Sequence, residues 1–543
     1  MNTYDSCEAL YKSSVSERDY WLEEREEACN HTVPYLHYSS DYETRNQEKK
    51  VLPWNGIGMK GVQNISSMLI TGMLPATTTF FRFMIDEMEM AEDERRMLEG
   101  GATPEDIATR KTELDLALAR MERATLHSIE TSNDRLAIHE ALQQLIVGGN
   151  ALLYVAEEGV KCFGLNKYII KRDPMGNPLL VIVCEKIGIE ALPEEARKLV
   201  DEQETDVAGI IEGDQNTKYK RNVEVYTKIT WEKNKVYWYQ EIKNQEIPGT
   251  RGTANKSESP WLPLRMYRTE GDSYSPSYIQ ATCIADLKTA EALTQAVTEG
   301  ALVSAQIRHL VKPSGVANPK KLAEAANGAY LAGNPDDITT VSINKGADMQ
   351  IAQSLLTTVE QRLSQSFMLY QPRQAERVTA EETRELNNML ERSLGSVYGI
   401  LVTELMQPFV SRKLFLLTKK GKIQKLPNDF VKPVVSVGYS AIGRQADLEK
   451  TARFMQILQQ TMGPESVATY VQPSELIKRL ASAMGMDLNG LVKTEQQLAE
   501  EQQAAQQQAL VQQAMQSGMA DPQKLANAAA TSQEMAQPPM EEQ

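Results

Sequence analysis

The chain has 543 residues and a formal net charge of −15 at pH 7, with five histidines and five cysteines. The length is enough for roughly three or four domain-sized units. The acidic balance excludes a protein whose whole monomer adheres to nucleic acid by bulk attraction. The cysteines are odd in number and widely scattered, which is typical of a reducing, cytosolic compartment and excludes a disulfide framework.

The N-terminus has no basic segment followed by an apolar core, and nowhere do about 18 apolar residues run without interruption. We therefore expect a soluble, unprocessed chain without a membrane anchor of its own.

The stretch PWNGIGMKG contains Gly56, Gly58 and Gly61 at the spacing that cradles a dinucleotide pyrophosphate in oxidoreductases. That function needs a buried strand directly before the glycines. A charged stretch that ends at Pro53 precedes them instead, and proline argues against a central strand. Apolar residues then recur at helical spacing, so we expect a helix that begins near Asn55 as its N-cap.

Residues 1–150 are otherwise predicted to be mostly helical, because charged stretches carry apolar residues at intervals of three and four. The sequence TPED predicts a helix start, with Thr103 as N-cap and Pro104 at the first helical position. The apolar run FFRFMID, which ends in Asp86, imitates the second strand of a nucleotide-binding fold.

From residue 151 to about 268, the apolar residues no longer recur at helical intervals. β-Branched and aromatic runs are broken by Pro, Gly and Asn, which is typical of β-hairpins. The clearest predicted turn runs from Asp173 to Asn177.

Two long helices are predicted on either side of a compact, turn-rich insert of residues 306–349. Residues 277–305 have no internal proline, and residues 350–369 place apolar residues at successive fours. Such helices with a small domain at their far end would form a stalk and a tip, although two helices of one globular core would share this periodicity. The apolar faces are Ile279, Cys283, Leu287, Ala290, Val297 and Ala301, and Ile351, Leu355, Val359, Leu363 and Phe367.

A third long helix is predicted over residues 380–407, where Thr379 as N-cap and Glu382 at the third helical position form a capping box. Its length would be about 42 Å at the usual rise per residue. The positions where it could bend or end are Gly395, Gly399 and Pro408.

Beyond about residue 445 the chain is again predicted to be helical. No aromatic residue follows Tyr470, and from about 496 a Gln, Ala and Met tail begins. We expect this tail to be disordered or loosely helical.

No catalytic or metal-binding constellation is found in the sequence. A phosphate-loop motif does not occur, and the cysteines form no C-x-x-C pair. His139 and Glu140 match the first two residues of the H-E-x-x-H motif of zinc proteases, but Gln143 occupies the position of the second histidine ligand. We therefore expect no enzyme, no metal site and no cofactor.

Nine stretches are informative in combination: WNGIGMKGVQNISSML, EALQQLIVGGNALLYV, YIIKRDPMGN, ALPEEARKLV, RMYRTEGDSYSPSYI, GAYLAGNPDDI, ERVTAEETRELNNMLERSLGSVYGIL, SAIGRQADLEK and GMDLNGLVKTEQQ. In this order, over nearly the full chain, they closely resemble the portal, or head-to-tail connector, proteins of short-tailed bacteriophages. The resemblance places the glycines of the first stretch in a helical region as packing and turn residues.

The resemblance implies an α+β, mainly helical portal fold, assembled into a ring of usually twelve identical subunits around an axial channel. Such a ring lies at one vertex of the viral head, and genomic DNA enters and leaves through it. The implied parts are an N-terminal wing region 1–276, a first stem helix 277–305, a clip 306–349, a second stem helix 350–369, a channel loop 370–378, a wing helix and following segment 379–439, a crown 440–495 and a flexible tail 496–543.

In the implied channel loop, Arg373 and Arg377 are the candidates to approach the DNA backbone, with Gln371 and Gln374 as sequence-blind polar neighbours. The alternative is that Arg377 pairs with a nearby acid or a neighbouring subunit.

In the implied clip, the candidate docking residues are Lys320, Lys321, Asp336 and Asp337. Solvated side chains without a partner are the alternative for the two lysines.

The implied partners are the packaging ATPase (large terminase), a tail adaptor, the major capsid and scaffolding proteins and internal core proteins, with no membrane. The implied location is the virion, after assembly in the host bacterial cytoplasm. Net negative charge suits a conduit, because each added phosphate contact would strengthen DNA binding. The alternatives are a nucleotide-binding oxidoreductase that uses Gly56, Gly58 and Gly61, and a generic cytoplasmic helical scaffold.

Overall fold

The computed structural model describes residues 6–37, 52–74, 80–84, 87–207, 222–306, 308–341, 346–369, 395, 397–423, 434–437, 443–462 and 476–477. The chain divides into two compact units, Met1–Arg110 with Arg120–Ala441, and Lys111–Ala119 with Ile442–Gln543. Helix α5, Pro104–Thr131, contributes to both units and begins at the proline, as predicted. Helix α14, Gly443–Met462, belongs to the second unit.

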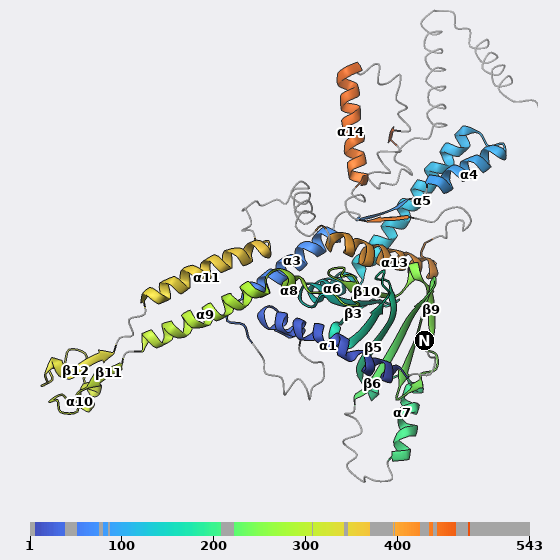
Figure 1. Ribbon diagram of the computed structural model, residues 1–543. Helices are drawn as coiled ribbons and strands as arrows, with labels where there is room; N and C mark the ends of the chain where they lie inside the picture. The colour runs from blue at the N-terminus through green and yellow to red at the C-terminus, as the bar shows by residue number, and fades with distance from the viewer. Residues whose placement is uncertain are drawn as a thin grey trace, which may run out of the picture. The chain divides into compact units, whose positions relative to one another are not determined.

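The first unit contains a six-stranded antiparallel sheet (Figure 1). Its strand β5, Pro178–Gly188, alternates between two cores. Val181 and Val183 belong to one buried cluster, whereas Leu180 and Ile182 belong to another, with Cys7 of the first helix. The continuous apolar run in β5 therefore reflects burial on both faces. The other strands are β4 Tyr168–Arg172, β6 Asn222–Glu232, β7 Lys235–Ile242, β8 Gln245–Glu246 and β9 Gly252–Asn255.

The hairpin prediction is confirmed at its clearest turn, because β4 and β5 pair antiparallel and the Asp173 N–H donates to Asn177 O at 2.9 Å. Helix α7, Glu194–Val207, interrupts the predicted hairpin region. Its start directly follows Pro193, and its first turn carries Glu194 and Glu195, which are favourable at a helix N-terminus.

A second, three-stranded sheet has the order β10-β2-β3, with β2 Asn150–Val155, β3 Val160–Gly164 and β10 Trp261–Arg265. Helix α6, Asp134–Gly148, precedes β2 and is buried along most of its length. It ends at Gly149 with φ 71°, where an added Cβ would lie 2.2 Å from Ser275 O. Glycine is required here by both conformation and space.

The first helix, α1 (Cys7–His31), is capped from two sides. Ser6 Oγ accepts from Ala9 N, and the buried Glu241 carboxylate of β7 accepts from Cys7 N at 3.1 and 3.2 Å. A carboxylate beside unpaired amides is favourable at a helix N-terminus.

Helix α3, Ile57–Met73, carries the three glycines. Its N-cap is Gly56 and not Asn55, although Asn55 Oδ1 accepts from Ile57 N at 2.9 Å. Residues 52–56 contain no strand. An added Cβ at Gly58 would lie 2.4 Å from His31 O, so this glycine allows α3 to approach the end of α1. The prediction that the glycines are packing residues is confirmed for Gly58 and Gly61, whereas an added Cβ at Gly56 would meet nothing within 4 Å. The strand that a dinucleotide site needs is absent from the described residues before Gly56.

The predicted helix over 277–305 is broken near its start. Helix α8, Tyr278–Thr282, ends at Cys283, and α9, Ile284–Ala305, begins there. Cys283 has φ −142° and ψ 3°, which lies outside the helical range, although its side chain keeps its place in the buried stripe. The helix predicted over 350–369 is α11, Gly346–Ser366, which begins and ends earlier.

Between α9 and α11 lies a small two-stranded sheet of β11, Arg308–Val311, and β12, Ile338–Val341. Helix α10, Pro319–Glu324, lies in the loop that joins the two strands. We call residues 308–341 the tip and α9 with α11 the helix pair. Figure 1 shows α9 and α11 side by side, with the tip at their far end.

The prediction that the third long helix ends at 407 is wrong. The described residues 397–401 are helical, a π-helical turn follows at Val402–Met406, and α13 then runs over Gln407–Lys419 with Pro408 in its first turn. Gln407 N donates to Val402 O, which widens the turn where proline lacks a donor. The capping box at Thr379 and Glu382 lies outside the described residues.

Strand β1, Phe81–Met84, lies in the apolar run FFRFMID and pairs antiparallel with β13, Val434–Val437, from the far end of the unit's sequence. None of the helices within the described ranges has both the length and the apolar character needed to span a bilayer.

Candidate functional site: the helix pair and its tip

The helix pair is held at one end by the segment before α3. Glu291 of α9 accepts from Trp54 N at 2.7 Å and from Asn55 N at 3.2 Å. The Asn55 amide then donates to Thr294 Oγ1 of α9 at 3.1 Å and to Glu360 of α11 at 3.0 Å. One side chain thus joins both helices to the start of α3.

Apolar burial within the helix pair stops part-way along its length. On α11, Val359 and Leu363 are fully buried, as is Phe367 directly after the helix, whereas Ile351 is 67% exposed and Leu355 is 48% exposed. On α9, Leu287 and Ala290 are buried, and the end toward the tip exposes Leu302 and Val303. The predicted stripe of α11 is therefore covered at Val359 and Leu363 and uncovered at Ile351 and Leu355. Leu302 and Val303 add exposed apolar side chains near the tip, although they lie outside the predicted stripe of α9. A run of uncovered apolar side chains marks a contact surface for another molecule.

The tip is organised around Asp337. This side chain is 8% exposed, and its Oδ2 accepts from Val316 N at 2.9 Å. Lys312 N donates to Asp337 O at 3.0 Å, and an added Cβ at Gly315 would lie 2.5 Å from the Asp337 carboxyl carbon. Asp337 therefore holds the loop after β11 against the start of β12.

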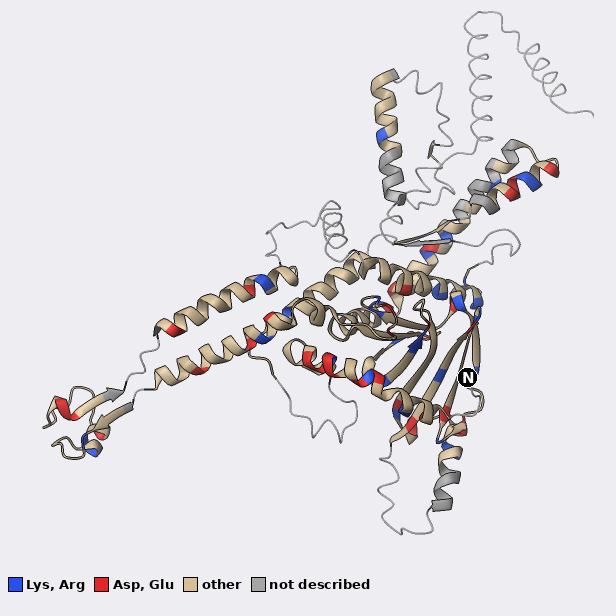
Figure 2. Cartoon of the chain, viewed as in Figure 1, with Lys and Arg blue, Asp and Glu red and all other residues tan. Residues whose placement is uncertain are grey.

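The other three predicted docking residues are exposed. Lys320 and Lys321 lie in α10, whose N-cap Asn318 accepts from Lys320 N at 3.0 Å. Asp336 lies in the short helical turn Pro335–Asp337 before β12, and its N–H donates to the side chain of Asn334, the N-cap of that turn. Figure 2 marks residues of both charge signs along the ribbon of the tip. The four residues lie in one small sheet-and-loop unit, with Asp337 inside it.

Apolar side chains are also exposed on the tip. Tyr330 is fully exposed, and Val316 and Leu310 are 79% and 61% exposed. Sequence reasoning selected only charged residues here. The signal that could have found the apolar ones is their presence in a turn-rich insert, where polar residues are the usual choice.

The predicted channel loop, 370–378, lies outside the described residues, and with it Gln371, Arg373, Gln374 and Arg377. The described chain ends just before this segment at Leu369.

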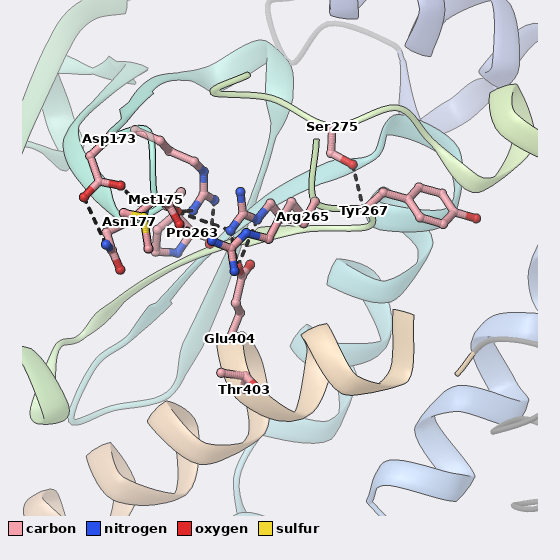
Figure 3. A network of polar contacts seen from close by, with 12 residues as sticks. Asp173, Met175, Asn177, Pro263, Arg265, Tyr267, Ser275, Thr403 and Glu404 are labelled. Carbon is pink, nitrogen blue, oxygen red and sulfur yellow. Dashed lines mark hydrogen bonds and ion pairs between the residues drawn. The ribbon is translucent and has the colours of Figure 1, made fainter. Parts of the chain in front are cut away.

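An arginine cluster that the sequence reasoning missed joins the π-helical turn to the sheets (Figure 3). Arg265, at the end of β10 and 4% exposed at its side chain, pairs with Glu404 at 2.8 Å and also donates to Gly176 O. Arg172 donates to the carbonyl oxygens of Gly176, Pro263 and Ser273, and burial lowers the pKa of its guanidinium to about 10. The β4–β5 turn is thus tied to β10 and to the helix that carries Glu404.

Cysteine and histidine side chains are further candidates for metal binding and for reactivity within the described part of the chain. No group of three or more His, Cys, Asp or Glu that could hold a metal occurs there. All five cysteines are free, and burial raises the pKa of the Cys29 thiol to about 11 and that of Cys283 to about 11. Burial lowers the pKa of His139 below its usual value, because it disfavours the charged imidazolium.

Comparison with known proteins extends along almost the whole chain. Residues 4–492 match the model of the bacteriophage head to tail connecting protein family. The chain belongs to this family. As a connector, it is 32% identical over 509 residues to the portal protein of Escherichia phage T7, which covers 91% of this chain and 89% of the relative.

Two further relatives show how far this connector has diverged. It is 32% identical over 508 residues to the portal protein of Enterobacteria phage T3, with 91% of this chain and 89% of the relative covered. It is 26% identical over 499 residues to the portal protein of Enterobacteria phage SP6, with 91% and 90% covered. The nucleotide-binding alternative finds no support in these relatives.

Proposed function

We propose that this connector is a non-catalytic portal protein, which forms a ring at one vertex of a phage head and passes genomic DNA through an axial channel. The observation that carries the proposal is the half-covered helix pair of a chain whose family match spans residues 4–492. Side chains such as Ile351 and Leu355 are exposed in the single chain. Neighbouring copies packed around a ring would cover them.

The proposed roles follow the elements. Helices α9 and α11 act as the stem, and the tip acts as the clip that docks the packaging ATPase first and a tail adaptor later. Residues 370–378 act as the channel loop, where Arg373 and Arg377 approach the DNA backbone beside Gln371 and Gln374. Residues 440–495 act as the crown, and capsid, scaffolding and internal core proteins contact the ring from the head. We further propose twelve subunits, assembled in the host bacterial cytoplasm and retained in the virion.

Within the tip, we propose that docking uses Lys320, Lys321 and Asp336 together with the exposed Tyr330. Asp337 serves docking indirectly, because it holds the loop that carries Val316. Aromatic side chains are enriched in the centre of contact surfaces, and polar side chains line their rim.

Replacement of residues 307–345 by a short Gly-Ser linker tests the docking role. The linker joins the end of α9 to the start of α11, and Asn55 anchors the pair elsewhere, so the chain should fold and form rings. We expect loss of binding to the packaging ATPase and to the tail adaptor, measured by co-sedimentation with purified rings.

Removal of residues 496–543 is the matched control, because these residues lie beyond the family match and docking should persist. Undiminished docking by rings with the linker would contradict the role of the tip.

A further inference from the structure

Helix α11 ends in a chain reversal with an unusual residue at its centre. Leu369 N donates to Ser364 O at 2.8 Å, and Met368 N donates to Gln365 O at 3.1 Å. These two bonds define a Schellman motif, whose left-handed position is usually glycine. Here Met368 occupies it with φ 53° and is 5% exposed. A methionine in this conformation is strained, so contacts from elsewhere must hold it.

Those contacts come from α3. The Asn64 amide donates to Phe367 O at 3.0 Å and to Met368 O at 3.0 Å. One turn earlier, Gly61 lies against the Phe367 ring, where an added Cβ would be 2.2 Å from the ring carbon. We call residues 364–369 with Gly61 and Asn64 the joint.

The joint fixes the chain at the last described residue before the segment that carries Arg373 and Arg377. We propose that Gly61, Asn64 and Met368 are positioning residues for DNA passage, because the joint sets where the chain leaves the helix pair for residues 370–378. The inference rests on the proposed function, in which those residues act as the channel loop. It gives the Gly-x-x-Asn pair of α3 a role that the family resemblance does not supply.

Asn64→Ala tests the joint, and Asn55→Ala is its matched control. Both asparagines belong to the α3 region. The Asn55 amide nitrogen donates to two side chains of the helix pair, and the Asn64 amide nitrogen donates to two carbonyl oxygens directly after α11. Only Asn64 contacts the joint. Both variants should lose a similar amount of thermal stability, because each loses amide hydrogen bonds. The rate of hydrogen exchange at the Met368 and Leu369 amides should rise on the order of tenfold in Asn64→Ala and stay unchanged in Asn55→Ala.

The functional readout is nuclease-resistant DNA per particle, in particles whose portal ring carries each variant. We expect particles with Asn64→Ala to retain several-fold less DNA than particles with Asn55→Ala, at equal ring incorporation. Asn64→Gln keeps an amide donor on a longer side chain and should give an intermediate loss. If Asn64→Ala forms no rings, the comparison of Asn64→Gln with Asn55→Ala decides instead.

Equal DNA retention in the Asn64 variants and in Asn55→Ala would overturn the inference. A double variant that carries both Arg373→Ala and Arg377→Ala shows which claim has failed. If the arginine variant loses DNA and the Asn64 variants do not, the positioning role is wrong and the channel-loop assignment stands. If none of these variants alters DNA retention, the channel-loop assignment fails as well.

Discussion

The glycines of α3 differ sharply in what surrounds them. A Cβ added at Gly61 would collide with the Phe367 ring, whereas one added at Gly56 meets nothing within 4 Å. We predict that Gly61→Ala lowers the free energy of unfolding by about 1–3 kcal/mol, as overpacked sites do. Gly56→Ala should change it little.

Urea unfolding curves of the two variants provide the measurement. Phe367→Leu added to Gly61→Ala should recover part of the loss, because the smaller side chain makes room. Equal stability of Gly61→Ala and the unaltered chain would contradict the packing role.

Some features of individual residues could be predicted from the sequence, and others could not because they depend on tertiary contacts. That the glycines belong to a helix and not to a nucleotide-binding turn followed from the missing strand before Pro53 and from the helical spacing after it, whereas their packing role was implied only by the family resemblance. Phe367, which accepts from Asn64, and Glu404, which pairs with Arg265, lie more than 100 residues away along the chain, so no local pattern indicates these contacts. Met368 in a left-handed conformation contradicts local preference and is explained only by tertiary contacts.

Between elements, the buried pair of Asp134 and Lys413 joins the start of α6 to α13 at 2.5 Å. Their side chains are 0% and 7% exposed. Lys413→Met would leave a buried carboxylate without its partner, and we predict a loss of about 3–5 kcal/mol in the free energy of unfolding. Changing Asp134→Leu in the same chain should recover most of it.

Lys419→Met is the control for this pair. Lys419 lies in the same helix and pairs with Glu157, but both side chains are well exposed. Such a pair contributes little, so the control should unfold like the unaltered chain. The measurement is the free energy of unfolding of Lys413→Met, of Lys413→Met with Asp134→Leu, and of Lys419→Met. Equal stability of Lys413→Met and Lys419→Met would refute the prediction.

The sequence predicted which helices and strands exist better than it predicted where they begin and end. Strong periodicity identified the helix pair and the clearest hairpin, because burial on one face repeats along the sequence. The break at Cys283 and the passage of the helix through Pro408 were missed. Cys283 keeps the apolar spacing across the break, and the π-helical turn accommodates the proline without ending the helix.

For the whole molecule, the central claim is the ring. Apolar side chains of the helix pair are covered near α3 and uncovered toward the tip, where Leu302 and Ile351 are more than half exposed. Periodicity could predict the stripes, but it could not show which half the single chain covers. The proposed closed ring would cover these exposed side chains, whereas a monomeric helical scaffold would leave them in water.

The most direct measurement is the mass of the purified protein by native mass spectrometry, with images of stained particles. We predict a closed ring near twelve times the chain mass of 60.7 kDa, with an open axial hole. A stable monomer or dimer at every salt and protein concentration would contradict the portal function proposed here.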